Sequence, residues 1–92
     1  MLYTIGYRPH YEKALSQGKV MKLGRRPDYP GGSVWRTFEE AKAHCDGDHA
    51  VYGVEADWET DTAPSKNDWH DLLFDRPIVK LEEESHAAKR LT

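Results

Sequence analysis

The stretch TFEEAKAHCDGDHAVYGVEADW, residues 37–58, decides the fold class because it joins a capped helix to a patterned strand. Thr37 precedes the helix and Glu40 follows three residues later, which is the spacing of a capping box. In that motif the threonine hydroxyl accepts the amide of Glu40, and the Glu40 carboxylate reaches back to the Thr37 amide. We expect the helix to end near Gly47. Its apolar face carries Phe38, Ala41 and Cys45.

The second half of the stretch predicts a strand from Ala50 to Trp58, because apolar residues recur at every second position. The apolar side carries Ala50, Tyr52, Val54, Ala56 and Trp58. The other side becomes acidic towards its end, at Glu55 and Asp57. This pattern is typical of an antiparallel strand with one face on the core and one face in water.

Upstream of this stretch, the sequence predicts a strand, a helix and a second strand. Residues Leu2 to Tyr7 alternate in polarity and are rich in residues that favour strands. Pro9 then opens a short helix that Gly18 ends. Val20 to Leu23 is a short apolar run that fits a strand.

Three further segments complete the chain on the downstream side. Glu59 to Asn67 is predicted as an acidic loop, after which Asp68 caps a helical turn that Pro77 stops. Ile78 to Leu81 is the last predicted strand, and Glu82 to Thr92 has few apolar residues and is expected to be a flexible tail.

This order of elements predicts an α+β fold. We expect a small antiparallel or mixed sheet of four or five strands, with two short helices packed on one face. The connections are too short for the crossovers of a doubly wound parallel sheet. Residues 1–81 form the single expected domain, and residues 82–92 form the tail.

The composition is that of a small globular protein. The chain has 92 residues, of which 38% are hydrophobic, and its aromatic content of 11% is too high for a disordered chain. No apolar run approaches the roughly 20 residues that span a bilayer, and the N-terminus has no signal-peptide pattern. The single cysteine, Cys45, has no partner for an internal disulfide, so we expect a cytoplasmic protein that does not bind membranes.

Charge is divided unevenly along the chain. Residues 1–36 hold seven basic and two acidic side chains, whereas residues 37–75 hold eleven acidic and two basic ones. This division predicts either two oppositely charged faces or attraction between the halves within the fold. A net charge of −3 disfavours nucleic acid as a partner, although the first third has phosphate-binding residue types.

Two segments, GGSVWRTFEEA at residues 31–41 and VYGVEADW at residues 51–58, resemble small bacterial proteins of unknown function. That resemblance implies no activity. The layout of a strand, a capped helix and a second strand is also similar to part of the ADP-ribosyltransferase-like folds. The contiguous His10-Tyr11-Glu12 differs from the dispersed catalytic motif of those folds, so the resemblance assigns no catalytic residue.

A first candidate site is the alternating carboxylate series at the end of the predicted strand. If the strand continues, one face carries Glu55, Asp57, Glu59 and Asp61, with Trp69 close by in sequence. Oxygen ligands in this spacing suit Ca²⁺ or Mg²⁺, but Thr62 stands where an EF-hand needs glycine, and Asp68 stands where it needs glutamate. We interpret the series as a solvated acidic surface that faces a partner, with Trp69 as an interface residue.

A second candidate site is the loop between Gly24 and Gly32, which contains three glycines and two prolines. Paired arginines and free glycine amides suit a phosphate or a carboxylate. The predicted ligand-binding residues are Arg25, Arg26, Gly31, Gly32 and Trp35. The loop matches neither the P-loop nor the dinucleotide-binding pattern, and an ordinary connecting loop is the competing interpretation.

Histidine and cysteine residues do not form a recognisable metal or catalytic pattern. His44, Cys45, His49 and His70 lack the spacing of a zinc site, and adjacent residues such as His44 and Cys45 point apart on a helix. Cys45 also lacks the surroundings of a known nucleophile. We therefore predict no catalytic residue, no metal site and no cofactor.

Three functions remain open from the sequence. The favoured one is a non-enzymatic binding or accessory protein that meets another protein through a charged surface. The first alternative is a small-ligand or nucleotide-binding protein that holds an anion in the Arg25 and Arg26 loop. The second is an acidic protein that imitates nucleic acid and docks on a basic protein.

Overall fold

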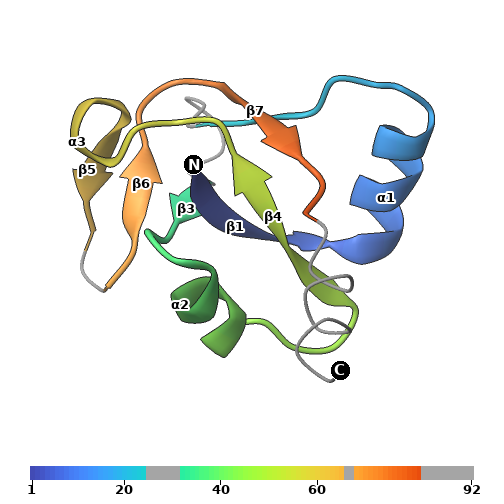
Figure 1. Cartoon of the computed structure of the whole chain (residues 1–92), viewed down its shortest axis with the longest axis horizontal. Helices are drawn as coiled ribbons and strands as arrows, with labels where there is room; N and C mark the ends of the chain where they lie inside the picture. The colour runs from blue at the N-terminus through green and yellow to red at the C-terminus, as the bar shows by residue number, and fades with distance from the viewer. Residues whose placement is uncertain (25–31, 66–67, 82–92) are drawn as a thin grey trace, which may run out of the picture.

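The computed structural model describes residues 1–24, 32–65 and 68–81, and in these residues seven strands and three helices follow one another (Figure 1). In chain order they are β1 (Leu2–Tyr7), α1 (Arg8–Ser16), β2 (Lys22–Leu23), β3 (Ser33–Val34), α2 (Phe38–Ala43), β4 (His49–Val54), α3 (Trp58–Asp61), β5 (Thr62–Pro64), β6 (His70–Leu72) and β7 (Arg76–Val79). The fold is α+β, as predicted. None of these helices is both long and apolar enough to cross a bilayer.

The strands form two antiparallel sheets, so the prediction of a single sheet of four or five strands is wrong. The four-stranded sheet has the order β1-β4-β7-β2, and the three-stranded sheet has the order β3-β6-β5. The longest pairing joins β1 to β4, from Leu2 opposite Val54 to Tyr7 opposite His49. The helical turn predicted for residues 69–74 is wrong, because β6 lies there and pairs with β5. The loop predicted from Glu59 to Asn67 is also wrong in part, because α3 and β5 occupy it as far as Pro64.

The two sheets are joined along the outer edge of β1. Tyr3 and Trp35 exchange backbone hydrogen bonds, with N···O distances of 3.0 and 2.8 Å. One residue further on, the buried Thr4 hydroxyl donates to the Ser33 carbonyl at 2.9 Å and satisfies a group that the ladder leaves unpaired. Both sheets therefore contribute to one curled surface.

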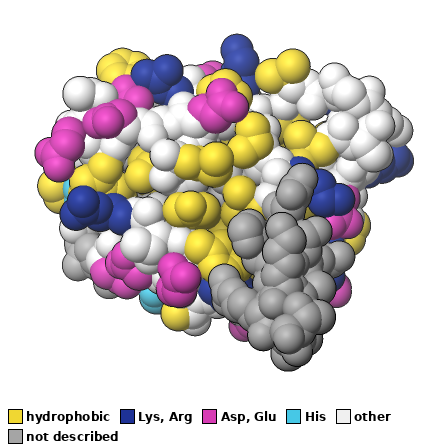
Figure 2. All heavy atoms as spheres, in the orientation of Figure 1, with side chains coloured by type: hydrophobic (Ala, Val, Ile, Leu, Met, Phe, Trp, Pro, Cys, Tyr) yellow, Lys and Arg dark blue, Asp and Glu magenta, His cyan; other side chains and the backbone are white. Residues whose placement is uncertain are grey.

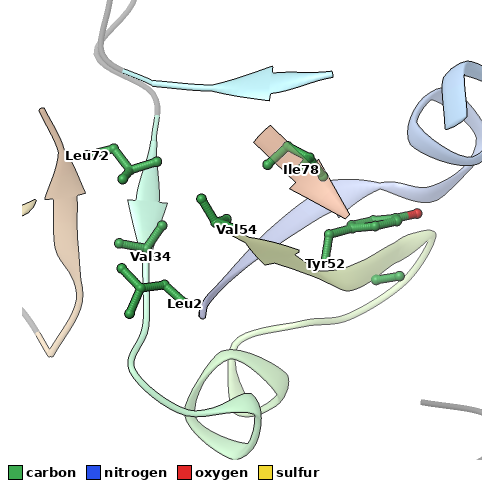
Figure 3. Close-up of a cluster of buried hydrophobic side chains, with 7 residues drawn as sticks. Leu2, Val34, Tyr52, Val54, Leu72 and Ile78 are labelled. Atoms are coloured by element: carbon green, nitrogen blue, oxygen red, sulfur yellow. The ribbon is translucent and has the colours of Figure 1, made fainter. Parts of the chain in front are cut away.

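The inner side of this curled surface holds the larger hydrophobic cluster. Its buried members come from five strands of both sheets, and most of them point towards one another in Figure 3: Leu2, Val34, Ala50, Tyr52, Val54, Leu72 and Ile78. A second cluster lies on the other side, around Trp35, Ala41 and Val51. Strand β4 is thus buried on both faces from Ala50 to Val54. The predicted wet face is wrong, because α2 covers it.

The two longer helices lie on opposite sides of the β1–β4 pair, and the prediction that both pack on one face is wrong. Tyr11 and Leu15 of α1 pack against the inner cluster. Phe38 and Ala41 of α2 belong to the outer cluster. The opposite placement explains why a short chain can bury both faces of its central strand.

Local signals define the ends of these helices. The Glu40 amide donates to the Thr37 hydroxyl at 3.2 Å, as the capping box predicts. The Glu40 carboxylate, however, accepts from the same hydroxyl at 2.9 Å rather than from the Thr37 amide. Helix α2 ends at Ala43, before the predicted position at Gly47. Gly18 ends α1 as predicted, with φ at 73° and its amide bonded to Leu15.

Candidate functional site

The row of four carboxylates expected on one strand face does not form, because β4 ends at Val54. Asp57 is instead the N-cap of α3, and its Oδ1 accepts two backbone N–H groups of the first turn at 2.9 and 3.0 Å. These hydrogen bonds, from Thr60 and then Glu59, hold the pKa of Asp57 below its ordinary value of 3.8. Capping thus uses one of the four carboxylates, although Asp57 stays exposed.

Asp61 differs from the other three because it is buried, with only 8% of its surface exposed. Its Oδ2 accepts the Asp57 amide at 2.8 Å, and its Oδ1 accepts from the Arg76 guanidinium at 2.7 Å. The Asp57 amide first, and Arg76 second, lower the pKa of Asp61. Asp61 therefore connects α3 to β7, and the surface carboxylates of the series are Glu55, Asp57 and Glu59.

We expect acid to destabilise the protein through Asp57 and Asp61. Both carboxyl groups have a folded-state pKa below the ordinary value of 3.8, so the folded state favours their ionised forms. Their contribution to stability is complete above about pH 5, where both groups are ionised in the unfolded chain as well, and it is lost as the pH falls through the folded-state pKa values. Urea unfolding at a series of pH values measures this loss as a decrease in the free energy of unfolding.

The variant Asp61→Asn separates this effect from general acid denaturation. It removes the charge that pairs with Arg76, so we expect a lower free energy of unfolding at neutral pH. As the pH falls, this free energy should also decrease less than it does in the wild type. The matched control is Glu55→Gln, which changes an exposed carboxylate by the same charge. If the free energy of unfolding of Asp61→Asn decreases in acid as steeply as that of the wild type, Asp61 is not the cause of the pH dependence.

The segment around α3 runs beside the turn between β6 and β7 and is bonded to it at both ends. The Glu55 amide donates to the Pro77 carbonyl at 3.0 Å, and the Leu73 amide donates to the Asp61 carbonyl at 2.9 Å. On the other side of the turn, Gly24 packs so closely that an added Cβ would lie 2.8 Å from the Asp75 nitrogen. The turn is therefore held from two sides.

This turn exposes two neighbouring apolar side chains. Leu73 is 39% exposed and Phe74 is 56% exposed. The other exposed large apolar residues of the described chain are not adjacent to one another: Met1, Tyr7 and Val20. Four exposed carboxylates belong to the same linked segments, and we call them, with Leu73 and Phe74, the acidic end: Glu55, Asp57, Glu59 and Asp75.

The structure distinguishes between the two interpretations of the charge division. Its described ion pairs join His44 to Asp68 at 3.4 Å and Arg76 to Asp61 at 2.7 Å, so none connects residues 1–36 with residues 37–75. In Figure 1, α1 lies at the opposite end of the long axis from α3. Exposed basic residues of the α1 end are Arg8, Lys13 and Lys19. On the face in Figure 2, acidic side chains lie towards the α3 end with basic side chains among them. The separation is not complete, because the exposed Asp48 lies beside Arg8 and the exposed Arg36 lies over the Trp58 ring of α3.

The predicted ligand-binding residues are only partly described. Arg25, Arg26 and Gly31 lie outside the described residues. Gly32 is buried with φ at 125°, and a Cβ there would lie 3.4 Å from the Gly24 backbone and 3.6 Å from Leu72. Glycine is therefore needed for backbone shape at this position. Trp35 packs in the outer cluster, so the two described members of the set lie in different surroundings.

Trp35 and Trp69, which the sequence assigned to different sites, contact one another through a third ring, His44. The ring centroids are 5.2 Å apart for Trp35 and His44, 5.6 Å for Trp35 and Trp69, and 5.7 Å for His44 and Trp69. Rings at these distances are in direct contact and leave no space for a ligand between them. The cluster is a packed part of the outer core, and a partner-facing role for Trp69 stays a prediction.

A second aromatic stack was missed by the sequence analysis. The Trp58 and His70 rings lie face to face, 3.7 Å apart and 15° from parallel, and the Arg36 guanidinium carbon lies 5.6 Å from the Trp58 ring. The Thr62 hydroxyl donates its single hydrogen to the Trp58 carbonyl at 2.6 Å, so it accepts from His70 Nδ1 at 2.8 Å. Residues 69–72 read Trp-His-Asp-Leu and do not alternate in polarity, so the sequence offered no periodic signal for this strand.

The described residues contain no group of three or more histidine, cysteine or carboxylate side chains that could hold a metal ion. Comparisons with protein-family models, with curated proteins and with solved structures find no match to the chain. The resemblance to small bacterial proteins therefore stays a prediction.

Proposed function

We propose that this chain is a non-enzymatic binding protein whose acidic end meets a basic partner protein. The observation that supports this most directly is the set of exposed carboxylates Glu55, Asp57, Glu59 and Asp75, none of which has an ion-pair partner among the described residues. Unpaired charge of one sign attracts a partner of opposite charge and favours it over others.

Of the two other functions, only the imitation of nucleic acid can be compared with the described geometry. An imitation of nucleic acid needs carboxylates in regular rows, whereas here Asp57 caps a helix and Asp61 is buried against Arg76. An anion-binding loop would depend on Arg25 and Arg26, which lie outside the described residues. We therefore favour the protein partner.

The test is a titration of the isotope-labelled protein with a short peptide of alternating glycine and lysine, followed by NMR. We expect amide shifts to change at residues 55–61 and 73–75 and not in α1. Raising the salt concentration from about 50 to about 300 mM should weaken binding severalfold, because it shortens the Debye length.

A charge-matched pair of variants makes this test specific. Glu55→Gln/Glu59→Gln removes two exposed carboxylates of the acidic end, and Glu39→Gln/Asp46→Asn removes two exposed carboxylates elsewhere. We expect the first variant to bind the peptide severalfold more weakly than the second. Equal weakening, or shift changes that centre on another surface, would refute the proposed function.

A further inference from the structure

We propose that the acidic end binds a basic protein segment that carries a large apolar side chain, and that Leu73 and Phe74 are the apolar anchors that pack against this side chain. This inference rests on the proposed function and specifies the chemistry of the partner. It assigns the contact to a pair of side chains at the turn between β6 and β7, and the carboxylates around them to a polar rim.

The turn presents these side chains from a fixed backbone. The Leu73 amide is bonded to the Asp61 carbonyl at 2.9 Å, and Arg76, three residues later, is bonded to the Asp61 carboxylate at 2.7 Å. Gly24 packs against the backbone of Asp75 from the other side. A backbone that is fixed before binding loses little conformational entropy when a partner docks, so the exposed area of Phe74 contributes more of its burial energy to affinity.

The energetics of interfaces explain why anchors are needed beside the carboxylates. Exposed charges at a rim mainly accelerate association and select partners, and they add little affinity because water and salt screen them. Most affinity comes from a few apolar or aromatic side chains that become fully buried within a polar rim. Leu73 and Phe74 supply such a centre, and the acidic end supplies the rim.

The negative charge of the rim indicates that the partner segment is basic. Leu73 and Phe74 share their linked segments with the carboxylates Glu55, Glu59 and Asp75, which have no ion-pair partner among the described residues. Arg76, two residues after Phe74, is paired with Asp61. By contrast, Arg8 beside Tyr7 and Lys19 beside Val20 have no ion-pair partner among the described residues. An acidic or purely apolar partner would leave the carboxylates of the rim uncompensated, whereas a basic apolar segment satisfies both parts of the surface.

The test compares two peptides of equal charge. One alternates glycine and lysine, and in the other half of the glycines are replaced by leucine. We expect the wild-type protein to bind the leucine peptide roughly tenfold more tightly, as the burial of one good anchor allows. Phe74→Ser should abolish this preference, so that the two peptides bind the variant with similar affinity.

Two further variants keep the result interpretable. Val20→Ser removes an apolar side chain that is 78% exposed and lies outside the turn between β6 and β7, and it should retain the preference for leucine. Phe74→Leu keeps an apolar side chain, so it should also retain the preference. If Phe74→Ser fails to fold, Leu73→Ala tests the neighbouring anchor, which is 39% exposed, and it should weaken the preference.

The outcomes separate the two proposals. A leucine preference that survives in Phe74→Ser, or the absence of any preference in the wild type, overturns the anchor assignment and leaves the proposed function intact if the glycine peptide still binds. Failure of both peptides to bind the acidic end overturns both proposals. Loss of the preference in Phe74→Ser, with Val20→Ser unaffected, establishes the anchors.

Discussion

Leu72→Ala should lower the free energy of unfolding by about 2–5 kcal/mol, the range for truncation of a fully buried leucine. Leu72 has no exposed surface and lies in the inner cluster, where it is the buried apolar residue contributed by the β5–β6 hairpin. Its removal leaves a cavity between the two sheets, next to Val34 and Val54 in Figure 3. Because a whole domain is stable by only about 5–15 kcal/mol, much of the protein would be unfolded at modest urea concentrations.

The neighbouring residue supplies the control for this prediction. Leu73→Ala removes the same atoms from a side chain that is 39% exposed, so no closed cavity forms and the loss should stay within about 1 kcal/mol. Urea unfolding followed by tryptophan fluorescence measures both variants. Equal losses would mean that the hairpin is not anchored through Leu72. A small loss in Leu73→Ala would also show that the exposed turn can be altered without unfolding the protein.

Signals carried by a few neighbouring residues predicted local structure well. The bounds of β1 are those expected from its alternation, and Thr37 and Gly18 act as the cap and the stop that their residue types indicate. Such features depend on hydrogen bonds and backbone angles within one turn of chain, which any surroundings leave nearly unchanged.

Features that depend on distant parts of the chain were predicted poorly. Alternation continues in the sequence to Trp58, but β4 ends at Val54 because Asp57 caps the helix that follows, and the cap was read as one more strand residue. The placement of α1 and α2 on opposite sides of β4 depends on how the sheet curls. No sequence pattern within a short segment predicts this curvature. The buried Val51 and Gly53, on the side assumed to be wet, were the available hint.

The candidate sites show the same limit. The acidic series was recognised from composition, but which of its members reach solvent follows from the α3 cap and from Arg76, fifteen residues after Asp61. Leu73 and Phe74 fall in the predicted helical turn, so only the structure reveals their exposure. Trp35 and Trp69 are far apart in sequence, and only β3–β6 pairing brings them together.

Gly6→Ala should destabilise the protein by about 1–3 kcal/mol, although it adds a single methyl group. Gly6 is buried in β1, and an added Cβ would lie 2.6–2.7 Å from three atoms of the Tyr11 ring. The ring cannot move away freely, because its other neighbour is Tyr52, at 4.8 Å between centroids. The start of α1 is also held, since the Arg8 amide donates to the Asp48 carbonyl at 2.8 Å.

A double-mutant cycle tests whether the clash with Tyr11 is the cause. Tyr11→Ala alone should destabilise, because it removes a ring that packs on the inner cluster. In that background the added methyl group at position 6 has space, so Gly6→Ala should cost clearly less than it does in the wild type. Urea unfolding of the four proteins gives the coupling energy. If Gly6→Ala costs the same in both backgrounds, the penalty arises in the strand itself and not in the contact between β1 and α1.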